Sequence, residues 1–418
     1  MATSLKIKNI VAQEILDSSG KPSISVKVFL DNDLEASAAY PSDFYAAPFA
    51  KEDKSDGDKK RFKGLGQLLA VRKIQEIIAP KLIGKKITDQ KAIDEVLSVI
   101  AQTSKSLPHS ALFATSSACA ILGAKASKKE LFDYLNEQFS LGDKKIPVPI
   151  FNIFNGGDTG DTSLDFQEFL LIPKKGKAAD MVRSGAEVFA ELGEVLSESS
   201  YDTDTGSEGG YAPDIDSTIE AIELVMSSII RSGYTPSQDF TLGIDIGSSI
   251  FYNETEGKYV FSLDNSYFHS SDLSGLYNEW LRKYPISYLE DPFNEKDWRS
   301  WRDLTADLGR DILIAGDDLF SSDINRFRES LKEKAANTIV IKPSQAGTLT
   351  EAIACAKLAH ERNYKVVISA RSRETLDTLI VDLAVACGAE FLKAGSLSRG
   401  ERVAKYNRLM EIGAIIGN

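Results

Sequence analysis

Apolar and polar residues alternate near the start of the chain, and a helical spacing replaces this alternation further along. Residues 23–28 alternate strictly and precede a turn-forming Asp-Asn-Asp run at 31–33, so we expect an antiparallel meander over the segment 1–40. From residue 63 to about residue 138, apolar residues recur every three or four positions, which predicts a layer of helices. Residues 45–60 are rich in Lys, Asp, Ser and Gly and are typical of a mobile surface loop.

A polar connector at residues 141–145 ends this first region, and short strands alternating with helices follow it. The candidate strands end near seven residues, which are Glu168, Asp245, Glu290, Asp317, Lys342, Ser369 and Lys393. The last five follow one another at nearly even intervals, and each interval is long enough for one strand, one helix and two loops. This repeat favours a closed (β/α) barrel over an open sheet. We therefore expect two domains, at residues 1–140 and 146–418.

Two predicted helix starts in the second domain carry the pattern of a capping box. Thr348 precedes Glu351 by three positions, and Ser398 precedes Glu401 by the same interval. In a capping box the hydroxyl and the carboxylate satisfy N–H groups at the helix start that have no partner within the helix. We therefore expect one helix to begin at each pair.

The composition is that of an acidic globular protein. The chain has 418 residues, with 49 basic and 61 acidic side chains and a formal net charge of −12. Most of such a surface repels phosphate, so we expect no binding to nucleic acid or to a membrane. The N-terminus lacks a long apolar run, and we expect a cytoplasmic protein. Cys119, Cys355 and Cys387 lie far apart in apolar surroundings, which favours buried thiols over a disulfide or zinc site.

Three acidic residues, Asp245, Glu290 and Asp317, stand where predicted strands end. The carboxyl ends of barrel strands form the face that carries the active site. Three carboxylates gathered there would repel one another unless a cation lay between them, and hard oxygen ligands suit Mg²⁺. Any one of these acids could instead cap a helix, but the three together favour a divalent-metal site.

Two lysines, Lys342 and Lys393, end strands on the same face. Burial and a neighbouring positive charge would lower the pKa of an amine, which could then act as a base near neutral pH. Removal of a proton next to a carboxylate gives an enolate, whose charge a bound cation stabilises. Each lysine taken alone could equally form a structural pair with a barrel acid.

Two further acids, Glu168 and Glu208, lie on predicted loops. A carboxylic acid that keeps its proton beside a second carboxylate could donate that proton to a leaving hydroxyl group. The histidines His109, His269 and His360 fall away from every candidate strand end. A histidine base is therefore not expected.

Several short motifs follow one another along the chain in a fixed order. They include Asn155-Gly156-Gly157, Asp165-Phe166-Gln167-Glu168-Phe169, Glu208-Gly209-Gly210, Leu289-Glu290-Asp291-Pro292-Phe293, Gly316-Asp317-Asp318-Leu319 and Glu401-Arg402-Val403-Ala404-Lys405. These motifs resemble those of the enolase family, which interconverts 2-phosphoglycerate and phosphoenolpyruvate in glycolysis and gluconeogenesis. The resemblance runs nearly end to end and is strongest from residue 146 onward. The resemblance implies an enolase-type (β/α)8 barrel whose first units depart from simple βα order. It also implies an N-terminal α+β capping domain and a homodimer or higher assembly.

The resemblance further implies roles for the residues at the strand ends. Asp245, Glu290 and Asp317 would hold the first Mg²⁺. Lys342 would take the C2 proton of 2-phosphoglycerate, and Lys393 would help to neutralise its carboxylate. These implied roles agree with the chemistry expected from the residue types alone.

The remaining implied roles concern the leaving group and the phosphate. Glu208, with Glu168, would assist loss of the C3 hydroxyl, and Gln167 would lie close by. Arg371 and Ser372 would bind the phosphate. The expected partner is therefore a small phosphorylated carboxylate.

The chain departs from the family pattern at several of its loops. Residues 41–46 read Pro-Ser-Asp-Phe-Tyr-Ala where the family has the loop whose serine binds a second Mg²⁺, so Ser42 or Asp43 would have to substitute. Thr159 and Ala370 replace two family histidines. Two smaller differences are Ser207, where the family has an acid, and residues 17–20, which lack an expected arginine.

These residues leave three functions open. The first is the family reaction on 2-phosphoglycerate, which the retained lysines and metal acids favour. The second is proton abstraction from a different carboxylate, with the additional Arg373 beside Arg371 selecting another anion. The third is a catalytically impaired relative kept for binding. It is the least favoured, because such a relative would lose Lys342 as readily as the loop.

Overall fold

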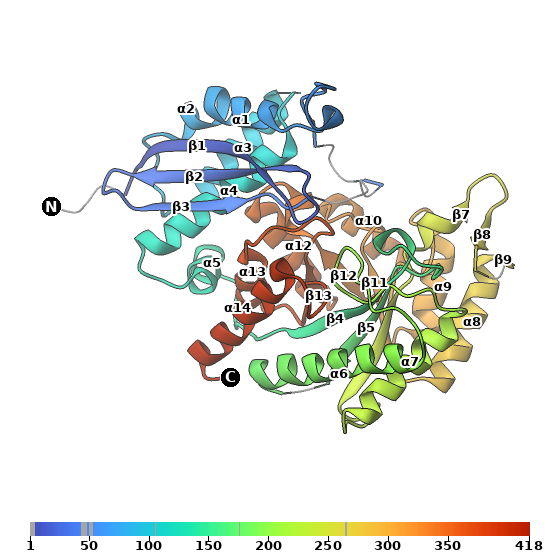
Figure 1. Cartoon of the computed structure of the whole chain (residues 1–418). Helices are drawn as coiled ribbons and strands as arrows, with labels where there is room; N and C mark the ends of the chain where they lie inside the picture. The colour runs from blue at the N-terminus through green and yellow to red at the C-terminus, as the bar shows by residue number, and fades with distance from the viewer. Residues whose placement is uncertain (1–4, 43–47, 50–52, 105, 175, 264–265) are drawn as a thin grey trace.

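The first domain contains a three-stranded antiparallel sheet. The computed structural model describes residues 5–418 apart from 43–47, 50–52, 105, 175 and 264–265. The strands of this sheet are, in order, β1 (Ile7–Leu16), β2 (Pro22–Leu30) and β3 (Glu35–Ala39) (Figure 1). The predicted meander is therefore confirmed. Its alternating pattern buries Ile24, Val26 and Val28 on one face of β2.

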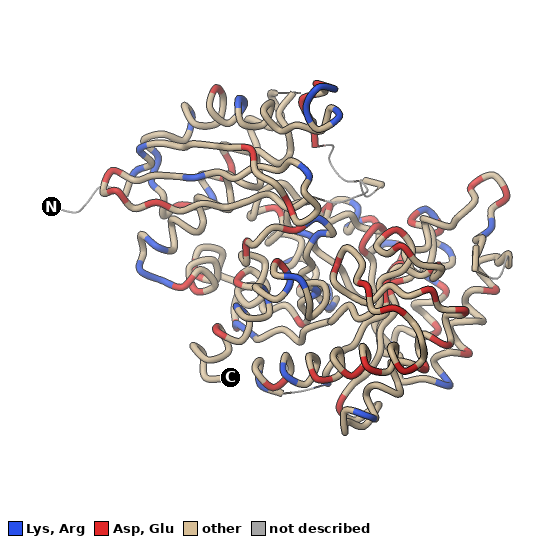
Figure 2. The backbone as a smooth tube through the Cα atoms, viewed as in Figure 1, with Lys and Arg blue, Asp and Glu red and all other residues tan. Residues whose placement is uncertain are grey.

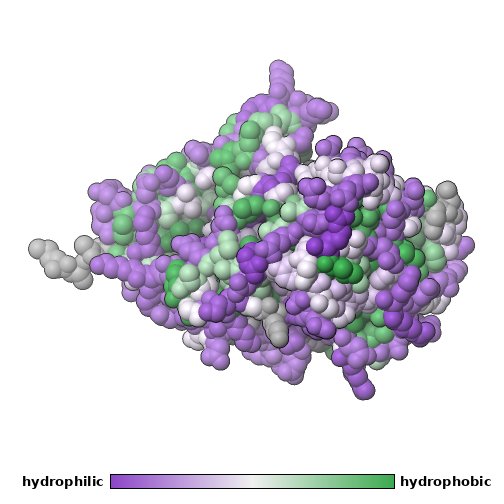
Figure 3. Space-filling model, turned by 60° about the horizontal axis from the view of Figure 1, so that its bottom comes forward, coloured by the Kyte–Doolittle hydropathy of each residue, from purple (hydrophilic) through white to green (hydrophobic). Residues whose placement is uncertain are grey.

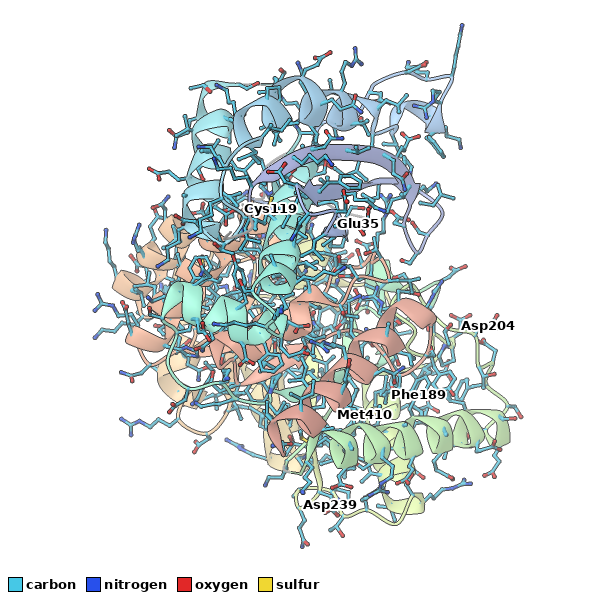
Figure 4. The ribbon with its side chains drawn as sticks, turned by 90° about the vertical axis from the view of Figure 1, so that its left-hand side faces the viewer. Glu35, Cys119, Phe189, Asp204, Asp239 and Met410 are labelled. Atoms are coloured by element: carbon cyan, nitrogen blue, oxygen red, sulfur yellow. The ribbon has the colours of Figure 1, made fainter. Side chains whose placement is uncertain are left out.

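Helices follow this sheet in the sequence. They are α1 (Leu68–Lys73), the π-helical turn η2 (Ile74–Ile78), α2 (Ala79–Leu82), α3 (Gln90–Thr103), α4 (His109–Ala126) and α5 (Leu131–Phe139). Of these, α1, η2, α2 and α4 contact the sheet, whereas α3 and α5 pack mainly against other helices. Regular helix begins later than residue 63, because Lys63 has a positive φ within the short turn η1 (Phe62–Gly64). Helix α4 contacts both the sheet and barrel helices, so nearly all of it is buried; Figure 4 shows Cys119 within it.

Part of the loop predicted at residues 45–60 lies outside the described residues, and its described end is tied to helices. Asp53 accepts a hydrogen bond of 2.9 Å from the N–H of Ser110 in α4. Asp56 accepts bonds of 3.1 and 2.6 Å from the first two N–H groups of α1. These carboxylates satisfy N–H groups that have no partner within their helices.

The second domain is built around a closed barrel of eight strands. They are β4 (Val148–Asn155), β5 (Glu168–Pro173), β6 (Phe240–Asp245), β10 (Ile286–Glu290), β11 (Leu313–Gly316), β12 (Thr338–Ile341), β13 (Lys365–Ser369) and β14 (Phe391–Lys393). The barrel closes where β14 pairs with β4, with Phe391 opposite Val148. The predicted barrel is confirmed.

One strand, β5, runs opposite to the rest of the barrel. It pairs antiparallel with both β4 and β6, whereas the other neighbouring strands pair in parallel. The prediction that a strand ends near Glu168 is therefore wrong, because Glu168 begins β5. The reversal places Glu168 opposite Asp245, at the barrel end where the parallel strands finish.

Helices form the outer layer of the barrel. They are α6 (Ala178–Glu198), α7 (Thr218–Arg231), α8 (Ser270–Lys283), α9 (Trp298–Leu308), α10 (Ile324–Glu333), the short α11 (Pro343–Ala346), α12 (Leu349–Glu361), α13 (Leu379–Cys387) and α14 (Gly400–Ile416). The connection after β6 contains a small sheet that the sequence did not predict. Its strands are β7 (Tyr252–Asn253), β8 (Lys258–Phe261) and β9 (Ser266–Phe268), at the right of Figure 1.

The two predicted capping boxes have different outcomes. Thr348 and Glu351 form theirs, with reciprocal hydrogen bonds of 3.3 and 3.1 Å at the start of α12. At Ser398 and Glu401 the predicted helix start is confirmed, because α14 begins at Gly400, but the capping box is wrong, because the N-cap residue is Arg399 and no side chain caps the helix. The Ser398 hydroxyl instead donates to the carbonyl of Gly209 at 2.6 Å, which joins two loops at the barrel end.

Apolar side chains fill the barrel interior. They are Ile150, Leu170, Ile172, Tyr288, Ala315, Val340 and Val367. A filled interior leaves the ends of the strands as the place for a site. The three cysteines, all in the described part of the chain, are buried thiols, as predicted.

The surface is polar and acidic overall. Polar side chains cover most of the face shown in Figure 3. Acidic residues are densest over the barrel half of the molecule in Figure 2. Among the helices that the structure describes, none combines the length and the apolarity that a membrane crossing requires.

Candidate active site

A pocket of about 340 Å³ opens at the end of the barrel where the parallel strands finish. Its lining includes eight of the residues predicted for the site, which are Gln167, Glu168, Glu208, Asp245, Asp317, Lys342, Ser372 and Lys393. The barrel thus brings together residues that are far apart in the sequence. Glu290 lies directly beneath, fully buried against Lys393.

Lys393 lies among three carboxylates. Its Nζ is 2.6 Å from Asp245 Oδ2 and 2.9 Å from Glu290 Oε1, and both contacts are hydrogen bonds. Glu168 Oε2 is also 2.9 Å from this Nζ, but outside hydrogen-bond geometry. The hydroxyl of Tyr288 donates to the other oxygen of Glu290. All four charged side chains are nearly inaccessible to solvent, so the ammonium is their internal counter-charge.

The pKa of Lys393 is raised, whereas the sequence suggested that burial would lower it. Burial does favour the neutral amine, but the carboxylates of Asp245, Glu168 and Glu290 outweigh burial and hold the pKa well above its ordinary value. The sequence-based expectation of a neutral amine is therefore wrong for Lys393. Its position suits an ammonium that binds a carboxylate.

Lys342 follows β12 and pairs with Asp317. Its Nζ lies 2.5 Å from Asp317 Oδ2, and its side chain is 19% exposed, against 6% for Lys393. The backbone N–H of Lys342 donates to the hydroxyl of Ser322 at 2.9 Å, which fixes the chain where it turns into α11. Lys342 is therefore the more accessible of the two amines.

A compact group of acids lies beside this pair. Single carboxylate oxygens of Asp291, Asp317 and Asp318 lie within 4.8 Å of one another. Asp291 accepts hydrogen bonds of 3.0 and 2.9 Å from the N–H groups of Asp317 and Asp318, which holds the turn after β11. Burial and the neighbouring acids raise the pKa of Asp318 to about 8. Asp291 and Asp318 were not predicted as ligands, although each stands next to a residue that was.

These acids fit a divalent cation. Asp317 Oδ1 is buried and accepts no hydrogen bond from any described residue. Burial raises the pKa of Asp317 despite its pairing with Lys342, and burial together with the Asp245 carboxylate raises the pKa of Glu290 to about 7. Carboxylates held this close without enough positive charge are the ligand set that a hard cation stabilises.

Glu168 and Glu208 meet at the pocket although they belong to separate segments of the chain. Burial first, and then the nearby carboxylates of Glu208 and Asp245, raise the pKa of Glu168 well above its ordinary value. Gly210, which follows Glu208 by two positions, lets this loop lie close to Asn152 of β4, because a side chain at Gly210 would collide with Asn152. These surroundings therefore favour the protonated form of Glu168 more than solvent does.

The predicted substrate-binding residues come from different strand connections. Gln167, just before β5, lines the pocket and packs closely against Gly247, where φ is +57°. Ser372, after β13, also lines the pocket and follows Arg371, whose guanidinium donates to the hydroxyl of Ser344 at 2.6 Å. Arg371 is itself buried and is not among the residues that line the pocket.

The positions that lack the family histidines also line the pocket. Thr159 holds its own loop, with hydroxyl hydrogen bonds of 2.8 and 2.9 Å to the carbonyls of Gly156 and Gln167. Ala370 presents only a methyl group. None of the described lining residues is a histidine. His109 lies nearer a strand end than expected, because its Nε2 is 3.1 Å from the carbonyl of Gln345 in α11.

Ser42 lies behind the pocket rather than in its lining. Its N–H donates to the carbonyl of Arg373 at 3.0 Å, and the N–H of Arg373 donates back at 2.9 Å. Its hydroxyl oxygen is buried and bonds to no described residue. Asp43, the other residue suggested for a second metal, is outside the described residues. The Arg373 side chain binds Asp17 and does not line the pocket, which argues against its selecting an anion there.

Comparison with protein families covers nearly the whole chain. Residues 7–135 match the family model described as "Enolase, N-terminal domain". Residues 143–418 match the model described as "Enolase, C-terminal TIM barrel domain". The closed eight-stranded barrel of the structure agrees with the second match. The chain therefore belongs to the enolase family.

Proposed function

We propose that this protein is a magnesium-dependent hydro-lyase that interconverts 2-phosphoglycerate and phosphoenolpyruvate. The observation that carries the proposal is the placement of Lys342 and of the Glu168–Glu208 pair around one pocket. Family membership supports this reaction class. The site then requires a base for C2 and an acid for the C3 hydroxyl, and these residues supply both.

Lys342 acts as the base and takes the proton from C2. It is the more accessible amine, and Asp317 at 2.5 Å orients it. Lys393 keeps its charge, because its pKa is raised, and holds the substrate carboxylate. Glu168, whose pKa is also raised, works with Glu208 to protonate the leaving hydroxyl. The C2–C3 double bond forms as the C2 proton moves to Lys342 and water leaves C3.

Asp245, Glu290 and Asp317 hold the first Mg²⁺ in this proposal, and the neighbouring Asp291 and Asp318 are further candidate ligands. The bound ion would stabilise the negative charge that develops on the carboxylate during proton removal. Ser42 would hold a second ion only after moving toward the pocket. Arg371 and Ser372 bind the substrate phosphate.

A second candidate is proton abstraction from a different carboxylate substrate. The observation that favours it is the chemistry of the wall formed by Thr159 and Ala370, whose side chains carry no positive charge. Without a histidine there, only Glu168 and Glu208 remain to protonate a leaving group. This wall therefore suits a leaving group that departs more readily than hydroxide and depends less on a proton donor. The base and the metal acids would keep the same roles.

We also propose that the protein acts in the cytoplasm as a homodimer or higher homo-oligomer. Family membership supports the assembly. The acidic composition supports a protein that does not associate with nucleic acid or anionic membranes.

The test is the conversion of 2-phosphoglycerate to phosphoenolpyruvate by purified protein with Mg²⁺. We expect turnover that Lys342→Ala reduces by at least about 10³-fold, because the base is lost. The matched control is Lys365→Ala, since Lys365 begins β13 at the opposite barrel end and is 51% exposed. Equal losses in both variants would refute the role of Lys342.

Deuterium exchange at C2 separates the candidates. Exchange from solvent without elimination would show that the base works and that the leaving group is wrong, which favours the second candidate. Failure to bind Mg²⁺ in titration calorimetry would contradict both and favour a binding role for the chain.

A further inference from the structure

Residues 371–375 connect β13 to α13 and are fixed on the barrel side by two buried cations of α14. The Arg402 guanidinium donates to the carbonyls of Arg371 and Ser372, each at 2.8 Å. Lys405 Nζ lies 2.9 Å from Glu374 Oε2 and donates to the carbonyl of Thr375 at 3.0 Å. Both cations are fully buried. Contacts that lie entirely within the barrel domain therefore hold the carbonyls of Arg371, Ser372 and Thr375.

The opposite side of the same segment is held by the N-terminal domain. Ser42, beyond β3, exchanges two backbone hydrogen bonds with Arg373. Ser18, in the turn between β1 and β2, donates its N–H to the carbonyl of Glu374 at 2.8 Å. The segment that carries Arg371 and Ser372 is thus shared between the two domains.

An ion pair also joins this segment to the β1–β2 turn. Arg373 Nε and Nη2 lie 2.7 and 2.5 Å from Asp17 Oδ2. The Asp17 side chain is 0% exposed and that of Arg373 is 14% exposed. Asp17 Oδ1 accepts three further hydrogen bonds, from the N–H and the hydroxyl of Ser19 and from the N–H of Lys21, at 2.8 to 3.0 Å. One carboxylate oxygen is therefore held rigidly by the turn, which leaves the other to orient the arginine.

We propose that Asp17 and Arg373 form an interdomain latch that positions Arg371 and Ser372 beside the pocket. This inference rests on the proposed function, because that function assigns these two residues to substrate binding. Arg373 is a positioning residue, because its side chain contacts the N-terminal domain while the two residues before it lie beside the pocket. Loss of the latch leaves the contacts to α14 intact, so the segment loosens without detaching.

The test compares Arg373→Lys and Asp17→Asn with a matched pair elsewhere. Arg408 and Asp382 form a similar pair, with contacts of 2.7 and 3.0 Å and side chains 16% and 3% exposed. Arg408 also binds Glu130, at the start of α5 in the N-terminal domain, at 2.8 Å and pairs with Glu411 at 2.9 Å, so it too is an interdomain cation, but it lies outside the pocket lining. Arg408→Lys is therefore the control. We expect the latch variants to raise KM for 2-phosphoglycerate roughly 3- to 30-fold with kcat nearly unchanged, and the control to leave both unchanged.

Backbone hydrogen exchange gives a readout that does not require turnover. We expect faster exchange in peptides that contain Ser42 and residues 371–375 in both latch variants, with no change at β12. The double variant should add little to either single one, because the two residues act through the same contact. Unchanged exchange in these peptides, or an equal KM effect in Arg408→Lys, would overturn the latch. If the unaltered protein has no turnover, the proposed function fails, and the exchange result still decides the latch.

Discussion

Replacement of Lys393 by alanine would leave three buried carboxylates without their ammonium. The Nζ lies within 2.9 Å of Glu168, Asp245 and Glu290, whose side chains are at most 6% exposed. Removal of one partner from a buried ion pair costs about 3–5 kcal/mol, because an uncompensated charge stays in the interior. We expect Lys393→Ala to lose about this much stability near pH 8 in the absence of divalent metal.

The loss should depend on pH with a defined sign. Burial and the Asp245 carboxylate already raise the pKa of Glu290 to about 7, and Lys393 opposes that rise. Without the ammonium the folded-state pKa of Glu290 rises further, so the folded protein holds protons that the unfolded chain releases above its pKa of about 4.5. Stability of the variant then falls as the pH increases. We expect a smaller deficit at pH 5.5 than at pH 8.

The assay is thermal unfolding followed by circular dichroism, with EDTA or with Mg²⁺. The deficit at pH 8 corresponds to roughly 5–15 °C in melting temperature for a domain of this size. Mg²⁺ should stabilise the variant more than the unaltered protein, because a cation replaces the lost charge. The control is Lys8→Ala, which breaks an exposed pair with Asp33 and should change the melting temperature little. A metal-free variant as stable at pH 8 as at pH 5.5 would refute the reasoning.

Two further predictions concern stability away from the pocket. Burial alone would raise the pKa of Glu390. Its hydrogen bond with His360, together with other hydrogen bonds and nearby positive charges, outweighs burial and holds the pKa at about 2. The ionised Glu390 carboxylate therefore stabilises the folded protein above pH 4.5, and this stabilisation is lost as the pH falls toward 2. Glu390→Gln should lower the free energy of unfolding in urea by about 1–2 kcal/mol at pH 7, a figure reduced for the partial exposure of the side chain. The loss should become progressively smaller in acid. Gly185→Ala in α6 should cost about 1–3 kcal/mol, because a methyl group there would collide with Phe151, whereas Gly275→Ala in α8 meets open space and should gain about 0.5–1 kcal/mol. Equal effects of the two glycine substitutions would contradict the packing argument.

The even intervals between the candidate strand ends predicted the barrel, because each βα repeat returns the chain to the same end of the barrel. The strand ends at Asp245, Glu290 and Lys393 agree with the structure. Spacing carries no information on strand direction, so the reversal of β5 was missed. The small β7–β9 sheet was missed for a related reason, because its strands of two to four residues are too short for an alternating pattern.

The convergence of acids and lysines was predictable from their strand ends, but their pairing was not. Whether Lys393 meets one carboxylate or three depends on which strands are neighbours across the barrel. The number of carboxylates around the amine decides whether its pKa rises or falls, and the identity of one residue in the sequence does not give that number. Arg373 shows the same limit, because its partner Asp17 lies 356 residues away in the chain. Adjacent acids in the sequence were the available signal for Asp291 and Asp318.

The pairing of the first barrel strand with the last one has a consequence for synthesis on the ribosome. Val148 of β4 lies opposite Phe391 of β14. The ribosome must therefore add the entire barrel sequence between these residues before this edge of β4 can pair with β14. At about 5–20 residues per second, translation takes roughly 12–50 s to cover this distance. During that time β4 has β5 as a neighbour on one side only. Its other edge is then open to pairing with foreign strands, and a chaperone that shields the nascent chain would act in this interval.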